Sequence, residues 1–368
     1  MILKSFEAKN FRNIESCKIE FTDGVNVLIG ENAQGKTNVA EGIYLFSRGK
    51  AFRTSDEREL VRFDTDGFNI AVEYESIIGK ERLEYSLYGK QRQRKKNGYK
   101  ISKVTEMIGS FKAVLFVPSD LTLVKGLPEE RRGFLNVAAS QCYGDYIKQY
   151  QGYKAALENR NCVLKNAKSG LYFDENEFYS WSKSLAAYAA VICRYRREYI
   201  KKMELYANRV MLDISEGKEE LSLYYKTDIP DKITEPTDIA REYERIFASE
   251  ISREIGYGSS LFGPHRDDIE ILINGKSARS FASQGQSRSV VLALKIAEGE
   301  VIKELYSEYP VFIFDDVMSE LDKSRRDYIL GSIKDKQIII TSCESDLYKD
   351  YVDNYIEVKG GKYVYSHR

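Results

Sequence analysis

The sequence predicts an α/β protein whose strand-forming residues lie in two halves, separated along the chain by a helical domain. Near the N-terminus a short apolar run, Val25–Ile29, leads into a glycine-containing loop and then into a helical pattern. Near the C-terminus a second apolar run, Val311–Phe314, ends in two aspartates, and residues 128–213 carry apolar positions three and four apart. Short apolar runs are typical of buried strands, whereas spacings of three and four are typical of helices. We therefore predict an N-terminal half over residues 1–117, an inserted helical domain over 118–248 and a C-terminal half over 249–368.

The composition sets limits on class and partners. The chain has 368 residues, more than one compact core usually holds, and its hydrophobic fraction of 43% is ordinary for a globular protein. The 56 basic and 56 acidic side chains cancel, so net charge does not draw the whole chain to nucleic acid. Any binding to DNA must therefore use a local patch or a surface built by assembly.

The expected location is the cytoplasm, with no contact to a membrane. No apolar run approaches the roughly 20 residues that span a bilayer, and the N-terminal residues lack the apolar stretch of a secretory signal. An odd and dispersed set of cysteines argues against a disulfide framework and against a zinc site. These are Cys17, Cys142, Cys162, Cys193 and Cys343.

The first motif is G-x-x-x-x-G-K-T at Gly30–Thr37, between a predicted strand and a predicted helix. Glycines let backbone N–H groups face phosphate oxygens, and the helix N-terminus adds a partial positive charge. Lys36 can reach the β- and γ-phosphates, and the Thr37 hydroxyl can ligate Mg²⁺. The alternative is a chance glycine turn before a helix, but the flanking elements fit as well as the letters. The residues predicted to hold a nucleoside triphosphate are Gly30, Glu31, Asn32, Ala33, Gln34, Gly35, Lys36, Thr37 and Asn38.

The remaining segments are assigned from their periodicity. Residues 2–29 predict three strands and residues 37–46 a helix, and the alternating segments 68–76 and 83–88 predict antiparallel strands. Asn97-Gly98 predicts a hairpin turn, and the basic run just before it either contacts phosphates or is simply a solvated hairpin tip.

The helical domain is predicted to turn between two long helices near Ser169-Gly170, although its second helical stretch could instead form a short coiled-coil arm. Its many tyrosines could stack on bases or could pack a core. Beyond it, residues 221–226 predict a strand and residues 233–255 a helix.

Two further stretches complete the predicted site. Asp315 and Asp316 end the second apolar run, the form of a Walker B strand, where the first acid would hold Mg²⁺ and the second would orient the attacking water. The alternative is a strand that ends in an acidic turn. Ser283 stands where a helix N-cap is expected, which makes a second anion site far from the first along the chain. Two such sites predict a nucleotide shared between subunits, bound by the loop of one and closed over by the serine of the other.

The order of phosphate loop, S-Q-G-Q at 283–286, Walker B and S-E-L-D at 319–322 resembles the ABC-type ATPases, and within them the DNA-repair branch beside the SMC proteins. Three more stretches resemble the RecF family of recombination mediators over essentially the whole chain. They are N-F-R-N-I at Asn10–Ile14, L-V-K-G-x-P-x-x-R-R at Leu123–Arg132 and G-P-H-R-D-D at Gly263–Asp268.

The resemblance implies an ABC-type P-loop ATPase head, with a mixed sheet in two lobes, and a helical second domain. It further implies ATP and Mg²⁺ as ligands, an ATP-dependent homodimer, weak DNA-stimulated ATP hydrolysis, and binding to double-stranded DNA and gap junctions. RecR and RecO would act with it to load RecA. Carried onto this chain, it assigns catalysis to Lys36, Asp315, Asp316 and Ser283, metal binding to Thr37 and Asp315, and further nucleotide contacts to Arg12, Gln284, Gly285 and Gln286. Asp322 is expected in the loop that touches the opposite subunit. The basic residues predicted to contact DNA, from their type and position only, are Arg92, Arg94, Lys95, Lys96, Lys125, Arg131 and Arg132.

Departures from the wider ABC pattern predict slow hydrolysis. The stretch at 283–286 reads Ser-Gln-Gly-Gln where transporters have Leu-Ser-Gly-Gly-Gln, and Thr341-Ser342 stands where transporters place a switch histidine. A transporter subunit and a P-loop kinase therefore explain the motifs poorly. The main rival is a nucleotide-sensing scaffold that recruits RecR with little DNA affinity of its own.

The stretch His265-Arg266-Asp267-Asp268 keeps two interpretations open. It is either a loop that faces nucleotide or partner, or a structural turn held by its own arginine–aspartate pair.

Overall fold

The structure is a computed structural model that describes residues 1–331, 335–344, 348 and 351–366. Its residues group into two compact units. The head unit comprises residues 1–122, 206–220 and 282–368, and the helical unit comprises residues 123–205 and 221–281.

These boundaries differ from the predicted ones in two main respects. Residues 206–220, predicted for the inserted helical domain, group with the head unit. Residues 249–281, predicted for the C-terminal half of the head, group with the helical unit. The physical reason is strand β10 (Asp268–Ile273), which pairs antiparallel with β9 (Leu221–Lys226) and buries the apolar side chains Ile269, Ile271 and Ile273. A strand paired in this way must belong to the unit of its partner.

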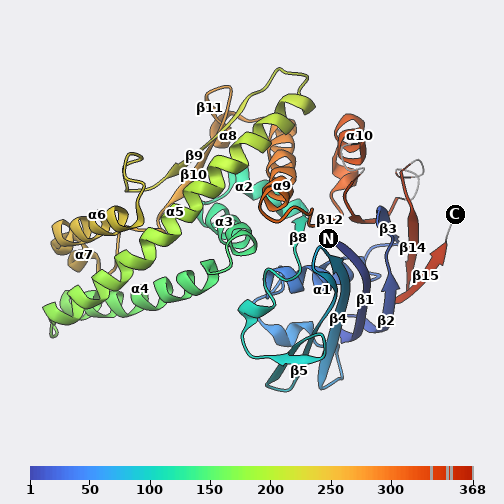
Figure 1. The fold of residues 1–368 in the computed structure, drawn as a ribbon, viewed down its shortest axis with the longest axis horizontal. Coiled ribbons are helices and arrows are strands. Elements are labelled where there is room, and N and C mark those ends of the chain that lie inside the picture. Colours follow the sequence, from blue (N-terminus) through green and yellow to red (C-terminus); the bar gives the residue numbers. More distant parts are fainter. Residues whose placement is uncertain (332–334, 345–347, 349–350, 367–368) are drawn as a thin grey trace. The chain divides into compact units, whose positions relative to one another are not determined.

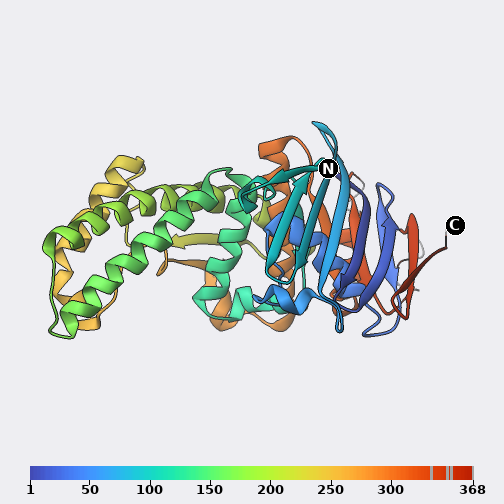
Figure 2. The same cartoon turned by 90° about the horizontal axis from the view of Figure 1, so that it is seen from below.

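One sheet of the head unit is antiparallel, with the strand order β2-β1-β4-β5-β6-β7 (Figure 2, blue to teal strands). Its strands are β1 Ile2–Phe11, β2 Ile14–Glu20, β4 Gly67–Ser76, β5 Gly79–Tyr88, β6 Gln91–Lys96 and β7 Tyr99–Ile101. The predicted turn is confirmed, because Asn97 and Gly98 both have positive φ, 51° and 83°, between β6 and β7.

The second sheet of the head unit is mixed and has the order β15-β14-β3-β13-β12-β8. Its strands are β3 Val25–Ile29, β8 Ala113–Phe116, β12 Val311–Asp315, β13 Ile338–Ser342, β14 Asn354–Lys359 and β15 Lys362–Ser366. All neighbours are parallel except β14 and β15. Strands from the N-terminal half (β3 and β8) are interleaved in this sheet with strands from the C-terminal half. The predicted α/β fold assembled from two distant halves is therefore confirmed.

Helix α1 (Lys36–Arg48) links the two sheets, since it contacts β1 and β4 of the first and β8, β12 and β13 of the second (Figure 1). Nearly every residue from Val39 to Ser47 is buried, as expected of a helix covered on both sides. The other helices of the head unit are η1 Glu57–Leu60, η2 Val104–Glu106, η3 Pro118–Leu121, α9 Gln284–Tyr306, η4 Met318–Glu320 and α10 Lys323–Gly331.

The helical unit packs long helices against a small sheet of order β11-β10-β9, with β11 at Lys276–Ser277. Its helices are α3 Pro128–Cys142, α4 Tyr146–Lys168, α6 Pro236–Ser249, α7 Ile251–Tyr257 and α8 Ala278–Phe281, and α5 (Glu175–Ile214) continues from this unit into the head. The short α2 (Thr122–Lys125) lies at the boundary along the chain. The predicted turn at Ser169-Gly170 is confirmed between α4 and α5. Tyr146, Tyr153 and Tyr243 are buried in the core of this unit, which supports packing for these rings. Across the described ranges of the chain, no helix is long and apolar enough to cross a membrane.

Candidate nucleotide-binding site

The phosphate loop lies where β3 ends and α1 begins, at the carboxyl edge of the mixed sheet. Gly30 must be glycine, because a Cβ there would lie 2.3 Å from the carbonyl oxygen of Val358 on the neighbouring strand. Gly35 has φ of 111°, which favours glycine, and a Cβ there would meet Oδ1 of Asn13 at 2.8 Å. The sequence therefore needs both glycines for the backbone to take this path.

Asn13, which the sequence analysis did not select, holds the loop from the turn between β1 and β2. Its amide donates to the carbonyl oxygen of Ala33 (3.2 Å), and its Oδ1 accepts from the Asn38 amide (2.6 Å). Ala33 itself takes a left-handed φ of 64°. Asn13 thus ties the middle of the loop to the first turn of α1, and only its place in the N-F-R-N-I stretch could have indicated this.

Lys36 lies on the floor of the loop and is 6% exposed. Its Nζ donates to the carbonyl oxygens of Gly30 (2.6 Å) and Glu31 (2.8 Å) and to Sγ of Cys343 (3.4 Å). The Cys343 thiol in turn donates to Oδ1 of Asn32. The ammonium group is therefore held inside the loop, where a phosphate oxygen could take over from a carbonyl.

The Walker B residue Asp315 contacts the phosphate loop, as predicted from its place at the end of a strand. The Thr37 hydroxyl donates to Oδ1 of Asp315 at 3.0 Å, although the two residues are 278 positions apart. The Thr341 hydroxyl donates to the same oxygen at 2.6 Å. Burial raises the pKa of Asp315, and the two hydroxyl groups oppose this rise. Thr37 and Asp315 thus offer two oxygens side by side, which is the donor set that Mg²⁺ prefers.

Asp316 follows with a left-handed φ of 56°, which is uncommon for a residue other than glycine. Its backbone N–H donates to Oγ1 of Thr341 at 3.1 Å and lies 3.3 Å from the carbonyl oxygen of the same residue. Thr341 of β13 therefore contacts both acids, the carboxylate of Asp315 and the backbone N–H of Asp316. The sequence analysis noted Thr341 only as a departure from the wider ABC pattern and missed its contacts.

These residues line one pocket of about 360 Å³, which includes Asn32, Ala33, Gly35, Lys36, Thr37, Asn38, Asp316 and Thr341. A larger pocket of about 1000 Å³ shares Asn13, Asn38 and Arg53 with it. Arg12, expected near the phosphates, lines this larger pocket. Gln34 instead points to the turn after β14, where its Oε1 accepts from the Gly360 N–H at 2.6 Å.

The Ser-Gln-Gly-Gln stretch forms the N-terminus of α9, as predicted. The Ser283 hydroxyl accepts from the Gln286 N–H (3.1 Å), and Oε1 of Gln286 accepts from the Ser283 N–H (2.8 Å), which is a capping box. Nε2 of Gln286 also donates to Glu219 at 2.8 Å. In the part of the chain that the structure describes, none of residues 283–286 lines the pocket around Lys36.

Arg325 of α10 ties this stretch to the following S-E-L-D loop. Its guanidinium donates to Oγ of Ser289 (2.9 Å), to the carbonyl oxygen of Gly285 (3.2 Å) and to the carboxylate of Asp322. The two stretches that are expected to contact the opposite subunit are thus joined to each other within one head unit.

The structure speaks against the prediction that Arg131 contacts DNA. Arg131 is 4% exposed, and its Nε and Nη2 donate to the two carboxylate oxygens of Asp268 at 2.6 and 2.8 Å. The guanidinium also donates through Nη1 to the carbonyl oxygens of Leu123 and Gly126. All three nitrogens of this group are therefore engaged inside the helical unit, where a phosphate cannot reach them.

Several other predicted DNA contacts also have partners within the chain. Arg132 donates to the carbonyl oxygen of Asp267 at 3.1 Å. In the basic hairpin, Arg92 pairs with Glu57, Lys96 with Glu81 (2.8 Å), and Arg94 lies over the ring of Tyr85. Lys95 is half-buried on β6 and Lys125 is exposed at the end of α2. The hairpin is therefore less open to phosphates than its sequence indicated.

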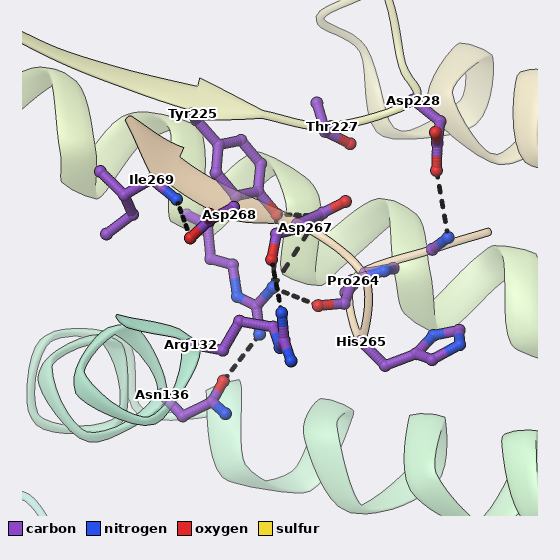
Figure 3. Close-up of polar contacts among 12 residues, drawn as sticks. Arg132, Asn136, Tyr225, Thr227, Asp228, Pro264, His265, Asp267, Asp268 and Ile269 are labelled. Atoms are coloured by element: carbon purple, nitrogen blue, oxygen red, sulfur yellow. Dashed lines mark hydrogen bonds and ion pairs between the residues drawn. The ribbon is translucent and has the colours of Figure 1, made fainter. Parts of the chain in front are cut away.

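The G-P-H-R-D-D stretch is the centre of a buried polar network (Figure 3). Asp267 is 3% exposed, and its carboxylate accepts from the Tyr225 hydroxyl and lies 3.8 Å from Arg196. Arg196 also donates to the carbonyl oxygen of Pro264 (2.7 Å) and to Asn136 (2.8 Å). Burial raises the pKa of Asp267 to about 6, against the opposing effects of Arg196 and the Tyr225 hydroxyl.

His265 belongs to the same network. One ring nitrogen lies 2.5 Å from the Tyr153 hydroxyl and the other 3.1 Å from the carbonyl oxygen of Ser260, and burial lowers the pKa of this imidazole to about 4. The arginines that hold the two aspartates come from α3 and α5, whereas Arg266 donates to Ser260. This supports the structural interpretation of the stretch, with partners that lie far away in sequence.

Comparison with known proteins agrees with this geometry. The family described as the RecF/RecN/SMC N-terminal domain matches residues 2–363. The chain is 36% identical over 364 residues to the DNA replication and repair protein RecF of Clostridium novyi, covering 97% of each chain, and 37% identical over 346 residues to that of Bacillus mycoides, covering 93% and 92%.

Solved structures give the same result. A structure of the recombination mediator protein RecF with ATP in the RecFOR pathway matches with a TM-score of 0.91 and 33% identity, over 99% of this chain and 97% of that one. An Smc head domain from Pyrococcus furiosus, solved with a bound ScpA domain, matches at 16% identity and a TM-score of 0.58, over 100% of this chain and 96% of that one, which shows a shared fold only.

Proposed function

This chain belongs to the RecF family of ABC/SMC-type ATPases, and we propose that it is an ATP-dependent DNA-binding protein of recombinational repair. The observation that carries the proposal is a pocket of about 360 Å³ at one edge of the mixed sheet, lined by Lys36, Thr37 and Thr341. Asp315 lies beside it and accepts from the hydroxyl groups of Thr37 and Thr341. Relatives of similar sequence have been solved with ATP.

Residues in and beside the pocket have separate parts in the proposed ATP site. The loop amides and Lys36 would bind the phosphates, and Thr37 and Asp315 would hold Mg²⁺, which would supply positive charge against the phosphates. Asp316 orients the water for hydrolysis. The larger pocket that shares Asn13, Asn38 and Arg53 has room for ribose and base. Because Thr341-Ser342 stands where transporters place a switch histidine, hydrolysis is slow and ATP binding is the main switch.

ATP joins two copies of the chain in this proposal. Ser283 and Gln284 are exposed, and residues 283–286 do not line the pocket around Lys36 in the described part of the chain. A helix N-terminus with exposed donors suits an anion from outside the subunit. The Ser-Gln-Gly-Gln stretch of each subunit would therefore close over the ATP that the other subunit holds.

The proposed partners are double-stranded DNA, gap junctions and RecR, with RecO and RecA in the same pathway. A second candidate function is a nucleotide-sensing scaffold that recruits RecR and binds DNA weakly. The buried Arg131 and the paired Arg92 and Lys96 favour this second candidate, because they reduce the basic surface available to phosphates.

The experiment that tests the proposal is the molecular mass in solution with and without ATP·Mg²⁺, for wild type, Lys36→Ala and Ser283→Arg. We expect wild type to dimerise with ATP and both variants to remain monomeric. Lys50→Ala is the matched control, since Lys50 is exposed just beyond the end of α1. A wild type that stays monomeric with ATP and DNA would reduce Ser283 to a helix cap and favour the scaffold.

The salt dependence of DNA affinity separates the two candidates. Each phosphate neutralised by the protein releases counterions, so a DNA clamp loses affinity steeply as salt increases. A scaffold binds DNA weakly at every salt concentration, and its DNA affinity changes little with salt. Its binding of RecR stays unchanged.

A further inference from the structure

Glu41 is a buried carboxylate that holds two arginines beside the phosphate loop. It lies on α1, one helical turn beyond Thr37, and its side chain is fully buried. Neither the phosphate-loop motif nor the Walker B motif includes it. A carboxylate without exposure is rare unless positive partners surround it.

The partners of Glu41 come from two separate segments of the head unit. Arg12, in the turn between β1 and β2, donates through Nε (2.9 Å) and Nη2 (3.1 Å) to the two carboxylate oxygens. Arg53, in the segment after α1, donates through Nη2 (2.5 Å), and its backbone N–H lies 3.3 Å from the other oxygen. Burial alone raises the pKa of Glu41, but the two guanidinium groups outweigh burial and hold the pKa below its ordinary value.

Both arginines face the space beside the loop. The side chains of Arg12 and Arg53 are 18% and 37% exposed, and Arg53 lines both the pocket around Lys36 and the larger pocket next to it. Arg53 also donates to Oδ1 of Asn38 in the first turn of α1, and Arg12 to the carbonyl oxygen of Glu59 (2.9 Å). Glu41 thus holds Arg53 where it lines the pocket around Lys36, whereas all three guanidinium nitrogens of Arg12 are engaged by Glu41 and Glu59.

We propose that Glu41 is a positioning residue for the nucleotide, which holds Arg53 at the wall of the pocket around Lys36 so that its guanidinium group meets the polyphosphate of a nucleoside triphosphate, while Arg12 braces the same carboxylate from the turn between β1 and β2. The inference rests on the proposed ATP site and adds a residue that acts through others. A role in stability alone explains the arrangement poorly, because a buried ion pair contributes little compared with apolar packing. A rigid carboxylate does, however, keep long arginine side chains in one geometry before the ligand arrives, which lowers the entropic cost of binding.

The test compares ATP·Mg²⁺ affinity by equilibrium titration in wild type, Glu41→Gln, Arg53→Ala and the double variant. Glutamine keeps the shape and one acceptor oxygen but loses the charge that binds two guanidinium groups. Loss of one charge-assisted contact to the ligand predicts roughly tenfold weaker binding for Glu41→Gln. If Glu41 acts through Arg53, the added effect of Glu41→Gln in the Arg53→Ala background should fall to roughly twofold or threefold.

Glu81→Gln is the matched control, because Glu81 is 9% exposed and pairs with Lys96 (2.8 Å) in the antiparallel sheet. It should bind ATP as wild type does. Glu41→Asp covers the case in which Glu41→Gln does not fold, since it keeps the charge and shortens the reach. We expect its ATP affinity to lie between those of wild type and Arg53→Ala, with an unfolding midpoint near that of wild type.

The outcomes separate the inference from the function on which it rests. If wild type does not bind ATP, the proposed function fails. If wild type binds and Glu41→Gln and Glu41→Asp bind equally well, the positioning role is overturned. The positioning role is also overturned if the effects of Glu41→Gln and Arg53→Ala simply add, because Glu41 would then act without Arg53.

Discussion

Replacing Asp268 by asparagine should destabilise the helical unit, because it leaves Arg131 buried without a counter-charge. The Arg131 side chain is 4% exposed and that of Asp268 is 23% exposed. Both carboxylate oxygens accept from Arg131, at 2.6 and 2.8 Å, and asparagine can offer only one oxygen and no charge. Breaking a buried pair from one side typically costs about 3–5 kcal/mol, and the partial exposure of Asp268 puts the expectation for Asp268→Asn at about 3 kcal/mol.

Tryptophan fluorescence offers a direct assay. The chain has a single tryptophan, Trp181, and it packs against the core of the helical unit. Urea unfolding followed by this signal therefore reports the helical unit separately from the head, which matters because the chain has two units and its unfolding need not be two-state. Glu270→Gln is the control, since Glu270 pairs with the exposed Lys226 on the same small sheet, and an exposed pair is worth roughly 0–1 kcal/mol.

A second comparison tests whether the cost arises from the unpaired charge. The double variant Arg131→Met/Asp268→Leu removes both charges and should be more stable than Asp268→Asn, since an apolar pair avoids the buried cation. The reasoning is refuted if Asp268→Asn unfolds within about 1 kcal/mol of wild type. It is also refuted if Arg131→Ala weakens DNA binding while leaving the unfolding transition unchanged, because Arg131 would then serve DNA.

Further variants test the subunit interface and the buried acid. Arg325→Gln should weaken ATP-dependent dimerisation roughly tenfold in analytical ultracentrifugation, because the Ser-Gln-Gly-Gln stretch is then no longer joined to Asp322. The ATP affinity of the monomer should stay unchanged. Dimerisation equal to that of wild type would show that Arg325 does not support the interface. Asp316→Asn should bind ATP and remain dimeric long after ATP is added, and dissociation at the wild-type rate would contradict the assigned role of Asp316. Burial raises the pKa of Asp267 to about 6 in the folded state, so the folded state binds this proton more strongly than the unfolded state does. The stability that this group contributes is therefore present at low pH and is lost as pH rises through 6. The stability of wild type relative to Asp267→Asn should therefore fall by up to about 3 kcal/mol between about pH 4 and pH 6.5 in urea titrations, and a flat difference would mean that the carboxylate titrates normally.

The parts of the site that could be predicted are those that the local sequence determines. A strand followed by a glycine loop and a helix places Lys36 and Thr37 without reference to the rest of the chain. The aspartate at the end of β12 follows from the same rule, because parallel strands end at one edge of a sheet. Ser283 was predicted as an N-cap from its position before an apolar helix, and its capping box with Gln286 confirms this.

The parts that could not be predicted depend on contacts between distant segments. Arg131 and Asp268 are 137 positions apart, so neither periodicity nor spacing relates them. Treating Arg131 as a surface cation followed from its residue type, and the error came from the lack of any sign of its partner. One signal was available, since the two family stretches at 123–132 and 263–268 carry net charges of opposite sign. Glu41 was missed for a similar reason, because a charged residue inside a helix gives no sign of burial until the arginines that cover it are known.

The position of α1 explains why these distant contacts meet at the nucleotide. Its first turn carries Thr37, which bonds to Asp315 of the mixed sheet, and its next turn carries Glu41, which binds Arg12 from the edge of the antiparallel sheet. Polar groups of both sheets therefore converge on two turns of one helix that is buried between them. A ligand that contacts Thr37 and the arginines bears on both sheets at once. The same arrangement makes the pocket sensitive to substitutions in either sheet. A change that shifts the turn after β1 should therefore weaken ATP binding, although this turn lies outside the phosphate loop and the Walker B strand.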